Sequence, residues 1–160
     1  MDIYQFLDEH DVAYTRYDHP AVYTVEEADA LVPDMDGIHT KNLFLRDKKG
    51  KRHFLVVAEA HATVNLKELA QKLAVSNVSF ASKERLMKYL GIEPGSVSPL
   101  ALFHDRDVGA VEVAFDRTVW ESPRICSHPM ANTATLLIEL DDLRKFLTAT
   151  GHGNITLVDF

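Results

Sequence analysis

The fold is decided by two apolar runs, Thr40-Lys41-Asn42-Leu43-Phe44-Leu45-Arg46 and His53-Phe54-Leu55-Val56-Val57-Ala58-Glu59, which flank the basic segment Asp47-Lys48-Lys49-Gly50-Lys51-Arg52. Apolar runs joined by a short segment that contains glycine are typical of a β-hairpin. We therefore predict strands at about 42–46 and 53–59, with the basic segment as the tip between them.

The rest of the chain predicts helices and further strands in a mixed order. Asp2, Ser82 and the capping box Thr24-Val25-Glu26-Glu27 indicate helix starts, because their side chains can accept hydrogen bonds from otherwise unpaired amides. Pro33 and Gly91 indicate helix ends. The predicted helices lie at about 2–10, 25–32, 65–74, 82–90 and 141–150, and the remaining strands at about 14–17, 100–104, 110–115, 134–140 and 155–159. We expect an α/β (mixed α+β) fold with a mixed sheet wrapped by helices, rather than a strictly alternating parallel sheet.

Length and composition predict one globular domain over residues 1–160. The chain has 160 residues, of which 46% are hydrophobic and 26% charged, and these values are ordinary for a single compact unit. The longest apolar runs are far shorter than a membrane helix, and the N-terminus lacks the features of a secretory signal. The chain has one cysteine, which cannot form an internal disulfide, so we expect a cytoplasmic protein.

Most catalytic signatures are missing from the sequence. There is no phosphate loop ending in Gly-Lys-Ser/Thr, no Gly-x-Gly-x-x-Gly, no His-Glu-x-x-His, no Gly-x-Ser-x-Gly and no pair of cysteines. These absences argue against nucleoside triphosphates, nicotinamide cofactors and structural zinc. The 8 histidines are scattered, so we expect neither a metal nor another cofactor.

Charge is distributed unevenly along the chain. The net charge is −7, but residues 41–88 contain 11 lysines and arginines against 4 acidic residues, which leaves −14 for the remainder. A solubilising turn is one interpretation of the hairpin tip, and contact with the phosphates of an acidic ligand such as RNA is the other. The candidate contacts are Arg46, Lys48, Lys49, Lys51 and Arg52.

Lys41 is an isolated cation in an apolar strand. Leu43 and Leu45 share its strand face, because side chains alternate between the two faces. An ammonium group among apolar neighbours is costly without an anionic partner. Lys41 is therefore a candidate for ligand binding, and the alternative is a lysine that extends its head to solvent.

The turn Pro94-Gly95-Ser96-Val97-Ser98-Pro99 is a candidate for a site made of backbone amides. Glycine allows a ligand to approach the backbone closely, and the prolines stiffen the turn. Two or three convergent N–H groups could stabilise an oxyanion without an ionisable side chain. Ordinary loops have the same composition, so this turn alone does not identify an enzyme.

The segment Cys126-Ser127-His128-Pro129 contributes two further candidates. In an extended segment Cys126 and His128 share a face, as a thiol nucleophile and its base would. A lone cysteine is more often a small buried hydrophobic residue. His128, which precedes a proline, is better explained as the wall of a pocket.

Several motifs, taken in order along the chain, resemble one known family. They are His19-Pro20 with Tyr23-Thr24-Val25-Glu26-Glu27-Ala28, then Thr40-Lys41-Asn42-Leu43-Phe44-Leu45, then Gly91-Ile92-Glu93-Pro94-Gly95-Ser96-Val97-Ser98-Pro99, then Ser127-His128-Pro129 with Asn132-Thr133-Ala134-Thr135. Over nearly its whole length the chain resembles the free-standing editing domains of the YbaK/prolyl-tRNA synthetase-associated superfamily, specifically the group that hydrolyses alanyl-tRNA(Pro). The resemblance implies a mixed, largely antiparallel sheet curled into a partly open barrel with helices around it.

The reaction that the resemblance implies is hydrolysis of an aminoacyl ester on the terminal adenosine of tRNA. This ester is already activated, so a positioned water, an oxyanion site and the neighbouring ribose hydroxyl can suffice. The resemblance implies Lys41, Gly95 and Ser96 as catalytic residues. Lys41 would contact the terminal adenosine or its phosphate with support from Asn42, and amides near Gly95, Ser96 and Val97 would face the ester carbonyl.

The resemblance also implies a pocket for the amino acid. His128, with Val97 and Ser98, would line it, and Val25 and Ala28 would close it, with core packing as the alternative for these last two. Steric exclusion is the expected source of specificity, because a pocket that selects by fit gains only ~1–3 kcal/mol per methylene. A closed pocket admits the methyl of alanine and rejects the proline ring. Members of the superfamily also act on cysteinyl-, seryl- or threonyl-tRNA, so the amino acid stays open.

The partner implied by the resemblance is the acceptor end of tRNA(Pro), with prolyl-tRNA synthetase as a second candidate and no membrane partner. Two functions of other classes stay open. One is a catalytically silent module that binds tRNA or a synthetase. The other is a small-ester hydrolase that uses Cys126 and His128.

Overall fold

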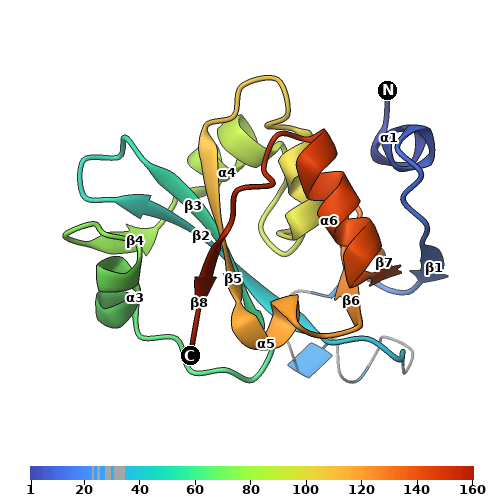
Figure 1. Cartoon of the computed structure of the whole chain (residues 1–160), viewed down its shortest axis with the longest axis horizontal. Coiled ribbons are helices and arrows are strands. Elements are labelled where there is room, and N and C mark those ends of the chain that lie inside the picture. The colour runs from blue at the N-terminus through green and yellow to red at the C-terminus, as the bar shows by residue number, and fades with distance from the viewer. Residues whose placement is uncertain (23, 25, 28–29, 31–34) are drawn as a thin grey trace.

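The computed structural model describes residues 1–22, 24, 26–27, 30 and 35–160, and its strands form two sheets (Figure 1). The larger sheet has the strand order β4-β2-β3-β5-β8, and the smaller one has the order β1-β7-β6. The strands of the larger sheet are β2 (Thr40–Asp47), β3 (His53–Glu59), β4 (Val78–Phe80), β5 (Val111–Asp116) and β8 (Thr156–Val158). Those of the smaller sheet are β1 (Thr15–Asp18), β6 (Arg124–Ser127) and β7 (Ala134–Glu139).

The predicted hairpin is present and forms the centre of the larger sheet. β2 and β3 pair in antiparallel register from Thr40 opposite Glu59 to Arg46 opposite His53. The pairs β2–β4, β1–β7 and β6–β7 are also antiparallel, whereas β3–β5 and β5–β8 are parallel. The sheet is therefore mixed and largely antiparallel, as predicted.

The two sheets meet beside the start of β2. Ile38 forms a parallel bridge with Ile125 of β6. In this bridge the Cys126 amide donates to the Ile38 carbonyl at 3.0 Å, and the Ile38 amide donates to the Arg124 carbonyl at 2.9 Å. This bridge is the one β-pairing between the sheets within the described ranges, so the strands curl around the core without closing a barrel.

Helices surround these sheets on both sides. They are α1 (Ile3–Glu9), α3 (Leu66–Lys72), α4 (Lys83–Leu90), the 3₁₀ helix η1 (Pro99–Phe103), α5 (Arg117–Trp120) and α6 (Leu140–Ala149). The main core joins the two sheets to α1, α4, η1 and α6, and its buried side chains include Phe6, Leu90, Leu102 and Phe146. A second core lies on the other face of the larger sheet, where α3 packs on Leu45, Phe54 and Val56. No helix in the described part of the chain is long and apolar enough to span a membrane.

The predicted helix caps are confirmed where the structure describes them. Asp2 forms a capping box with Gln5, and the Ser82 side chain accepts the Arg85 amide. Gly91 ends α4 with φ 64°, in the left-handed region where glycine is tolerated best. The Thr24 hydroxyl accepts the Glu27 amide at 3.0 Å, and most of the helix predicted at 25–32 lies outside the described residues.

One predicted element is wrong and three were missed. The strand predicted at 100–104 is the helix η1, in which Pro99 occupies the first turn and the Ser98 side chain accepts the Leu100 amide. A short, continuous apolar run fits a buried strand and a buried helix equally well, so the pattern could not distinguish them. β4, β6 and α5 were missed because each has only three or four residues, too few to show a period.

Candidate functional site

Lys41 lies on the face of β2 that carries Leu43 and Leu45, as alternation predicts. It is half-buried, and its ammonium group donates to the carbonyl of Ala62. Within the described residues no carboxylate forms an ion pair with it. The backbone therefore holds the lysine head in place while leaving its positive charge uncompensated.

The backbone segments that lead to Lys41 and to His128 lie side by side three residues before each of them. Ile38 and Ile125 form a parallel bridge there, and the two segments run in the same direction from it. The bridge thus brings together two segments that are 87 positions apart in the sequence.

The turn at residues 94–98 is attached to the His128 segment through Ser98. Its hydroxyl donates to the His128 carbonyl at 2.5 Å and accepts the Leu100 amide at 3.2 Å. Ser98 is fully buried. We call the assembly of Lys41, Asn42, residues 95–98 and His128 the Lys41–His128 corner.

One amide of the turn is already paired, and the others, including those of Gly95 and Val97, have no hydrogen-bond partner in the described structure. Gly95 has φ 93°, a left-handed backbone conformation that glycine adopts without strain. The Ser96 amide donates to the Glu93 carbonyl at 3.2 Å, so it is already paired. Among the described residues neither Gly95 nor Val97 has a partner for its amide. Of the three amides that the sequence suggested, those of Gly95 and Val97 are therefore unpaired and that of Ser96 is paired.

The ring of His128 is held as a neutral acceptor. Its Nδ1 lies 3.0 Å from the Ala134 carbonyl, and because a carbonyl can only accept, Nδ1 carries the proton. Burial lowers the pKa of His128 below its usual 6.5, although the bond to Ala134 opposes this shift, and the nearby His19 lowers the pKa further. The unprotonated Nε2 is then available to accept a hydrogen bond.

His19 belongs to the same cluster and was not predicted as a site residue. Its ring centroid lies 6.1 Å from that of His128. Its Nδ1 donates to the Pro20 carbonyl at 2.8 Å, and its Nε2 accepts the hydroxyl of Thr135 at 2.7 Å. The sequence carried a signal for it, because His19-Pro20 repeats the histidine–proline pair of His128 and Pro129.

Asn42 does not support Lys41 directly, which corrects the expectation from the sequence. The two side chains lie on opposite faces of β2, and the Asn42 amide group donates to the Thr40 hydroxyl at 3.2 Å. The Asn42 Oδ1 and the Ser127 Oγ are buried without a hydrogen-bond partner in the described structure. Leaving such an atom unpaired costs ~1–3 kcal/mol, so a water or a ligand group is expected there.

The remaining pocket residues predicted from the sequence are Val25 and Ala28. Both lie outside the described residues.

Cys126 is buried, and its surroundings do not suit a catalytic thiolate. Burial raises the pKa of its thiol to about 11. A Cβ atom at Gly37 would lie 3.0 Å from the Cys126 Sγ, so the backbone at this glycine packs closely over the sulfur. The structure therefore argues against a thiolate nucleophile.

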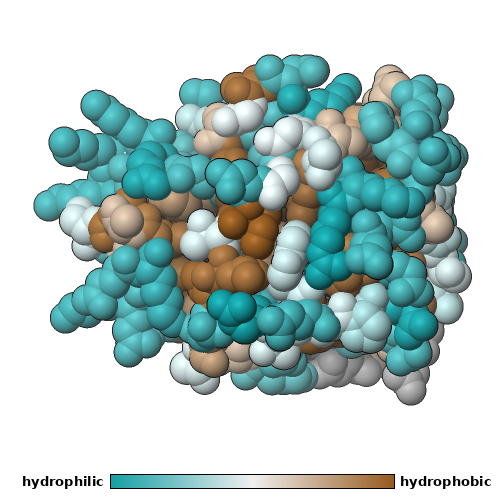
Figure 2. All heavy atoms as spheres, in the orientation of Figure 1, coloured by the Kyte–Doolittle hydropathy of each residue, from teal (hydrophilic) through white to brown (hydrophobic). Residues whose placement is uncertain are grey.

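The basic residues of the hairpin tip differ in how they are paired. Lys48, Lys49 and Lys51 are exposed. Arg52 is bound by both oxygens of Glu112, at 2.9 and 2.7 Å. Asp47 accepts the amides of Arg52 and Lys51, and these bonds lower the pKa of its carboxyl group. Figure 2 shows hydrophilic side chains projecting from the end of the molecule that holds this tip.

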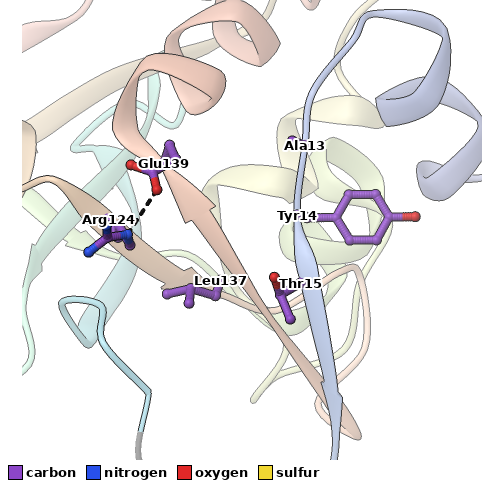
Figure 3. Close-up of a pocket in the computed structure, with 6 residues that line it drawn as sticks. All are labelled: Ala13, Tyr14, Thr15, Arg124, Leu137 and Glu139. Atoms are coloured by element: carbon purple, nitrogen blue, oxygen red, sulfur yellow. Dashed lines mark hydrogen bonds and ion pairs between the residues drawn. The ribbon is translucent and has the colours of Figure 1, made fainter.

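A cleft of about 290 Å³ lies elsewhere, on the outer side of the smaller sheet (Figure 3). Arg124 and Glu139 form an ion pair at one wall, across Leu137 from Thr15 of β1. Asp36 also pairs with Arg124, so the positive charge of the arginine is already compensated. None of the residues predicted from the sequence lines this cleft, and no group of three His, Cys, Asp or Glu side chains in the described ranges is placed to hold a metal ion.

Comparison with family models and known sequences identifies relatives along most of the chain. A family model described as an aminoacyl-tRNA editing domain matches residues 19–146. The chain is 41% identical to the prolyl-tRNA editing protein ProX of Acetoanaerobium sticklandii, over 91% of this chain and 88% of that protein. It is 38% identical to prolyl-tRNA synthetase associated domain-containing protein 1 of Xenopus laevis, over 98% of this chain and 95% of that protein.

Solved structures share the fold at low sequence identity. A crystal structure of a hypothetical protein covers 98% of this chain and 97% of its own, with a TM-score of 0.71 and 21% identity. A protein described as a proposed trans-editing enzyme for prolyl-tRNA synthetase covers 91% of this chain and 85% of its own, with a TM-score of 0.64 and 19% identity. At these identities the likeness concerns the fold.

Proposed function

Because this chain belongs to the aminoacyl-tRNA editing domain family, we propose that it is a trans-acting deacylase that hydrolyses the ester of mischarged alanyl-tRNA(Pro). The family match carries the proposal, because it spans all three segments that form the Lys41–His128 corner. The relative from Acetoanaerobium sticklandii supports prolyl-tRNA as the substrate class.

The proposed reaction needs no protein nucleophile. A water attacks the ester carbonyl, and the amides of Gly95 and Val97 stabilise the oxyanion that develops on the carbonyl oxygen. The ribose oxygen leaves with a proton, helped by the neighbouring hydroxyl, and the products are alanine and uncharged tRNA. Ser96 and Ser98 hold the turn through their own hydrogen bonds, so they position these amides instead of contacting the ester.

In this proposal the side chains of the corner recognise the substrate. Lys41 contacts the terminal adenosine or its phosphate, since its charge has no carboxylate partner among the described residues. His128 accepts a hydrogen from the α-ammonium group through Nε2, and the unpaired Oδ1 of Asn42 is a second acceptor for a substrate group or a bound water.

The proposed partner is the acceptor end of tRNA(Pro). Arg46, Lys48, Lys49 and Lys51 contact its phosphates, which makes binding salt-dependent. Arg52 contributes less, because Glu112 already neutralises its charge. Docking on a prolyl-tRNA synthetase would place the protein beside the source of its substrate.

The test is hydrolysis of tRNA(Pro) charged separately with alanine, cysteine and proline. We expect rapid loss of the alanyl ester above the uncatalysed background, slower loss of the cysteinyl ester and none of the prolyl ester. Binding of tRNA without loss of any ester would instead indicate a catalytically silent tRNA-binding module.

A further inference from the structure

The cations of this protein fall into two groups according to their partners. Arg16, Arg52, Arg117, Arg124 and Arg144 each form an ion pair with a carboxylate. At the hairpin tip and on α4, by contrast, most cations form no ion pair within the part of the chain that the structure describes. We call this group the basic end and define it by seven residues: Arg46, Lys48, Lys49, Lys51, Lys83, Arg85 and Lys88. Lys41, Lys67, Lys72 and Arg106 also lack an ion pair in the described structure but are not part of it.

Within the basic end, two guanidinium groups converge on Gly50. A Cβ atom at Gly50 would lie 2.9 Å from Arg85 Nη2 and 3.0 Å from Arg46 Nη1, so these two nitrogens lie within about 6 Å of each other. Gly50 has φ 69°, and its missing side chain leaves the space that they occupy. Two like charges at this separation repel each other, and an anion between or beside them offsets this repulsion.

Hydrogen bonds to the hairpin hold Arg85 in this position. Its Nη1 donates to the Gly50 carbonyl at 3.2 Å and to His53 Nε2 at 3.0 Å. His53 is buried and stacks on Tyr89 with ring centroids 3.9 Å apart. Since a guanidinium group can only donate, His53 Nε2 must be unprotonated. Burial, then the charge of Arg85, lower the pKa of His53, which agrees with a neutral ring.

The carboxylate that follows Arg46 in the chain is already hydrogen-bonded to the tip. One oxygen of Asp47 accepts the amides of Lys51 and Arg52 at 2.8 and 3.0 Å. It forms no ion pair with either converging arginine in the described structure. The arrangement is therefore a pair of neighbouring cations, of which Arg85 is held by hydrogen bonds, with unused donors at a half-exposed surface.

We propose that Arg46 and Arg85 together bind one phosphate group of the tRNA acceptor strand. Guanidinium groups bind phosphate oxygens with paired, charge-assisted hydrogen bonds. His53 and the Gly50 carbonyl act as positioning groups, because they hold Arg85 without neutralising it. The choice of tRNA as the source of the phosphate rests on the proposed function.

The distance along β2 is compatible with a second contact on the same RNA. Lys41 and Arg46 are five positions apart, about 17 Å along a strand, and a nucleic-acid strand carries one phosphate every few ångström. The two side chains start on opposite faces of β2, so an RNA whose terminal adenosine lies at Lys41 must pass around the strand to offer a phosphate to the arginine pair.

The experiment measures binding of uncharged tRNA(Pro) to the full chain by fluorescence anisotropy between low and high salt. For Arg46→Gln and Arg85→Gln we expect binding about tenfold weaker at low salt, and a plot of log affinity against log salt whose slope is smaller by about 0.7–0.9. Arg85→Lys keeps the positive charge but loses the planar set of N–H donors that a guanidinium group offers. Its affinity for tRNA should therefore lie between those of wild type and Arg85→Gln. Arg117→Gln is the matched control and should bind as wild type does.

Arg46→Gln also guards against misfolding, because Arg46 makes no side-chain hydrogen bond in the described structure, whereas Arg85 ties α4 to the hairpin. Wild-type affinity and salt slope in both variants would overturn the proposal. A second arm adds inorganic phosphate as competitor. Phosphate binding that the two substitutions weaken while tRNA binding is unchanged would show a small-anion site and overturn the assignment to tRNA.

This experiment separates the two proposals. A protein that hydrolyses no ester but whose tRNA binding weakens in both variants would contradict the proposed function and support the arginine site. If wild type and both arginine variants hydrolyse alanyl-tRNA(Pro) equally fast at substrate below KM, the proposed function is supported and the arginine site is contradicted.

Discussion

The Lys41–His128 corner and the basic end are built on opposite principles. The corner relies on backbone amides, a neutral imidazole and one lysine whose ammonium group is bound to a carbonyl. The basic end relies on several unpaired cations around a hairpin tip. The corner can stabilise charge that develops during a reaction, since its donors are fixed and partly shielded from water. The basic end can attract and orient a polyanion, but it has no group placed to act on an ester.

This difference predicts that the two regions control different kinetic quantities. Changes in the corner should lower the rate at saturating substrate and leave the salt dependence of binding unchanged. Changes at the basic end should raise KM, reduce the salt dependence and leave the rate at saturation alone. A variant that moves both quantities together would break the distinction.

The largest effect is expected for Lys41→Ala. Loss of the cation that orients the terminal adenosine should lower deacylation of alanyl-tRNA(Pro) about 100-fold, which is typical for removal of one fixed donor from an active site. Single-turnover kinetics measure the loss. Lys67→Ala, which removes an exposed lysine of α3, is the control and should retain the wild-type rate. Full activity in a correctly folded Lys41→Ala protein would remove the lysine from the mechanism.

A smaller effect is expected for His128→Ala. Loss of the acceptor for the α-ammonium group removes one hydrogen bond to a charged group, which corresponds to about tenfold in kcat/KM. The same assay measures it, alongside His10→Ala as a control on the exposed end of α1. If His128→Ala changed only the thermal stability and not kcat/KM, the histidine would be a packing residue of the corner.

The pH dependence of stability should be similar at both regions, because each holds a histidine in its neutral form, buried at His53 and half-buried at His128. His53 and His128 have pKa values lowered from 6.5, chiefly by burial. In the unfolded chain they bind protons at higher pH than in the folded protein, so stability is full above about 6.5 and falls as the pH drops through the lowered values. Urea unfolding at pH 8, 6.5 and 5 tests this sign.

The variant His53→Gln tests how much of this pH dependence comes from the histidine beside the basic end. His53→Gln removes one titrating group, and the decline in stability between pH 6.5 and 5 should become shallower than in wild type. The opposite sign, with stability rising as the pH falls through this range, would mean that the folded protein favours charged histidines and that the proton positions inferred from the hydrogen bonds are incorrect.

The sequence predicted the hairpin well because both strands are long enough to show their pattern. β3 was predicted at its observed bounds, and the basic tip lies where glycine and lysine indicated. Helix α4 was bounded by its cap Ser82 and by Gly91, which are local signals that need no tertiary contact. Elements with local signals were therefore accessible from one sequence.

The relations between distant segments were not accessible in the same way. The bridge that joins Ile38, before β2, to Ile125 depends on β6, a strand of four residues that shows no period. Arg85 reaches Gly50 from 35 positions away, and only the packing of α4 reveals it as a partner of the hairpin. The pairing of the Ser96 amide with Glu93 likewise follows from the shape of the turn, and composition cannot give it.

The smallest effect is expected for Cys126→Ala, which tests whether the corner uses any side-chain nucleophile at all. With a pKa of about 11, roughly one Cys126 thiol in 10⁴ is ionised at pH 7. The substitution should therefore leave the deacylation rate within about twofold of wild type, and pretreatment with a thiol-alkylating reagent should inhibit neither protein. A clearly slower rate in Cys126→Ala than in wild type would indicate covalent catalysis by the thiol in the corner. The distinction from the basic end would then rest on a nucleophile instead of on backbone amides.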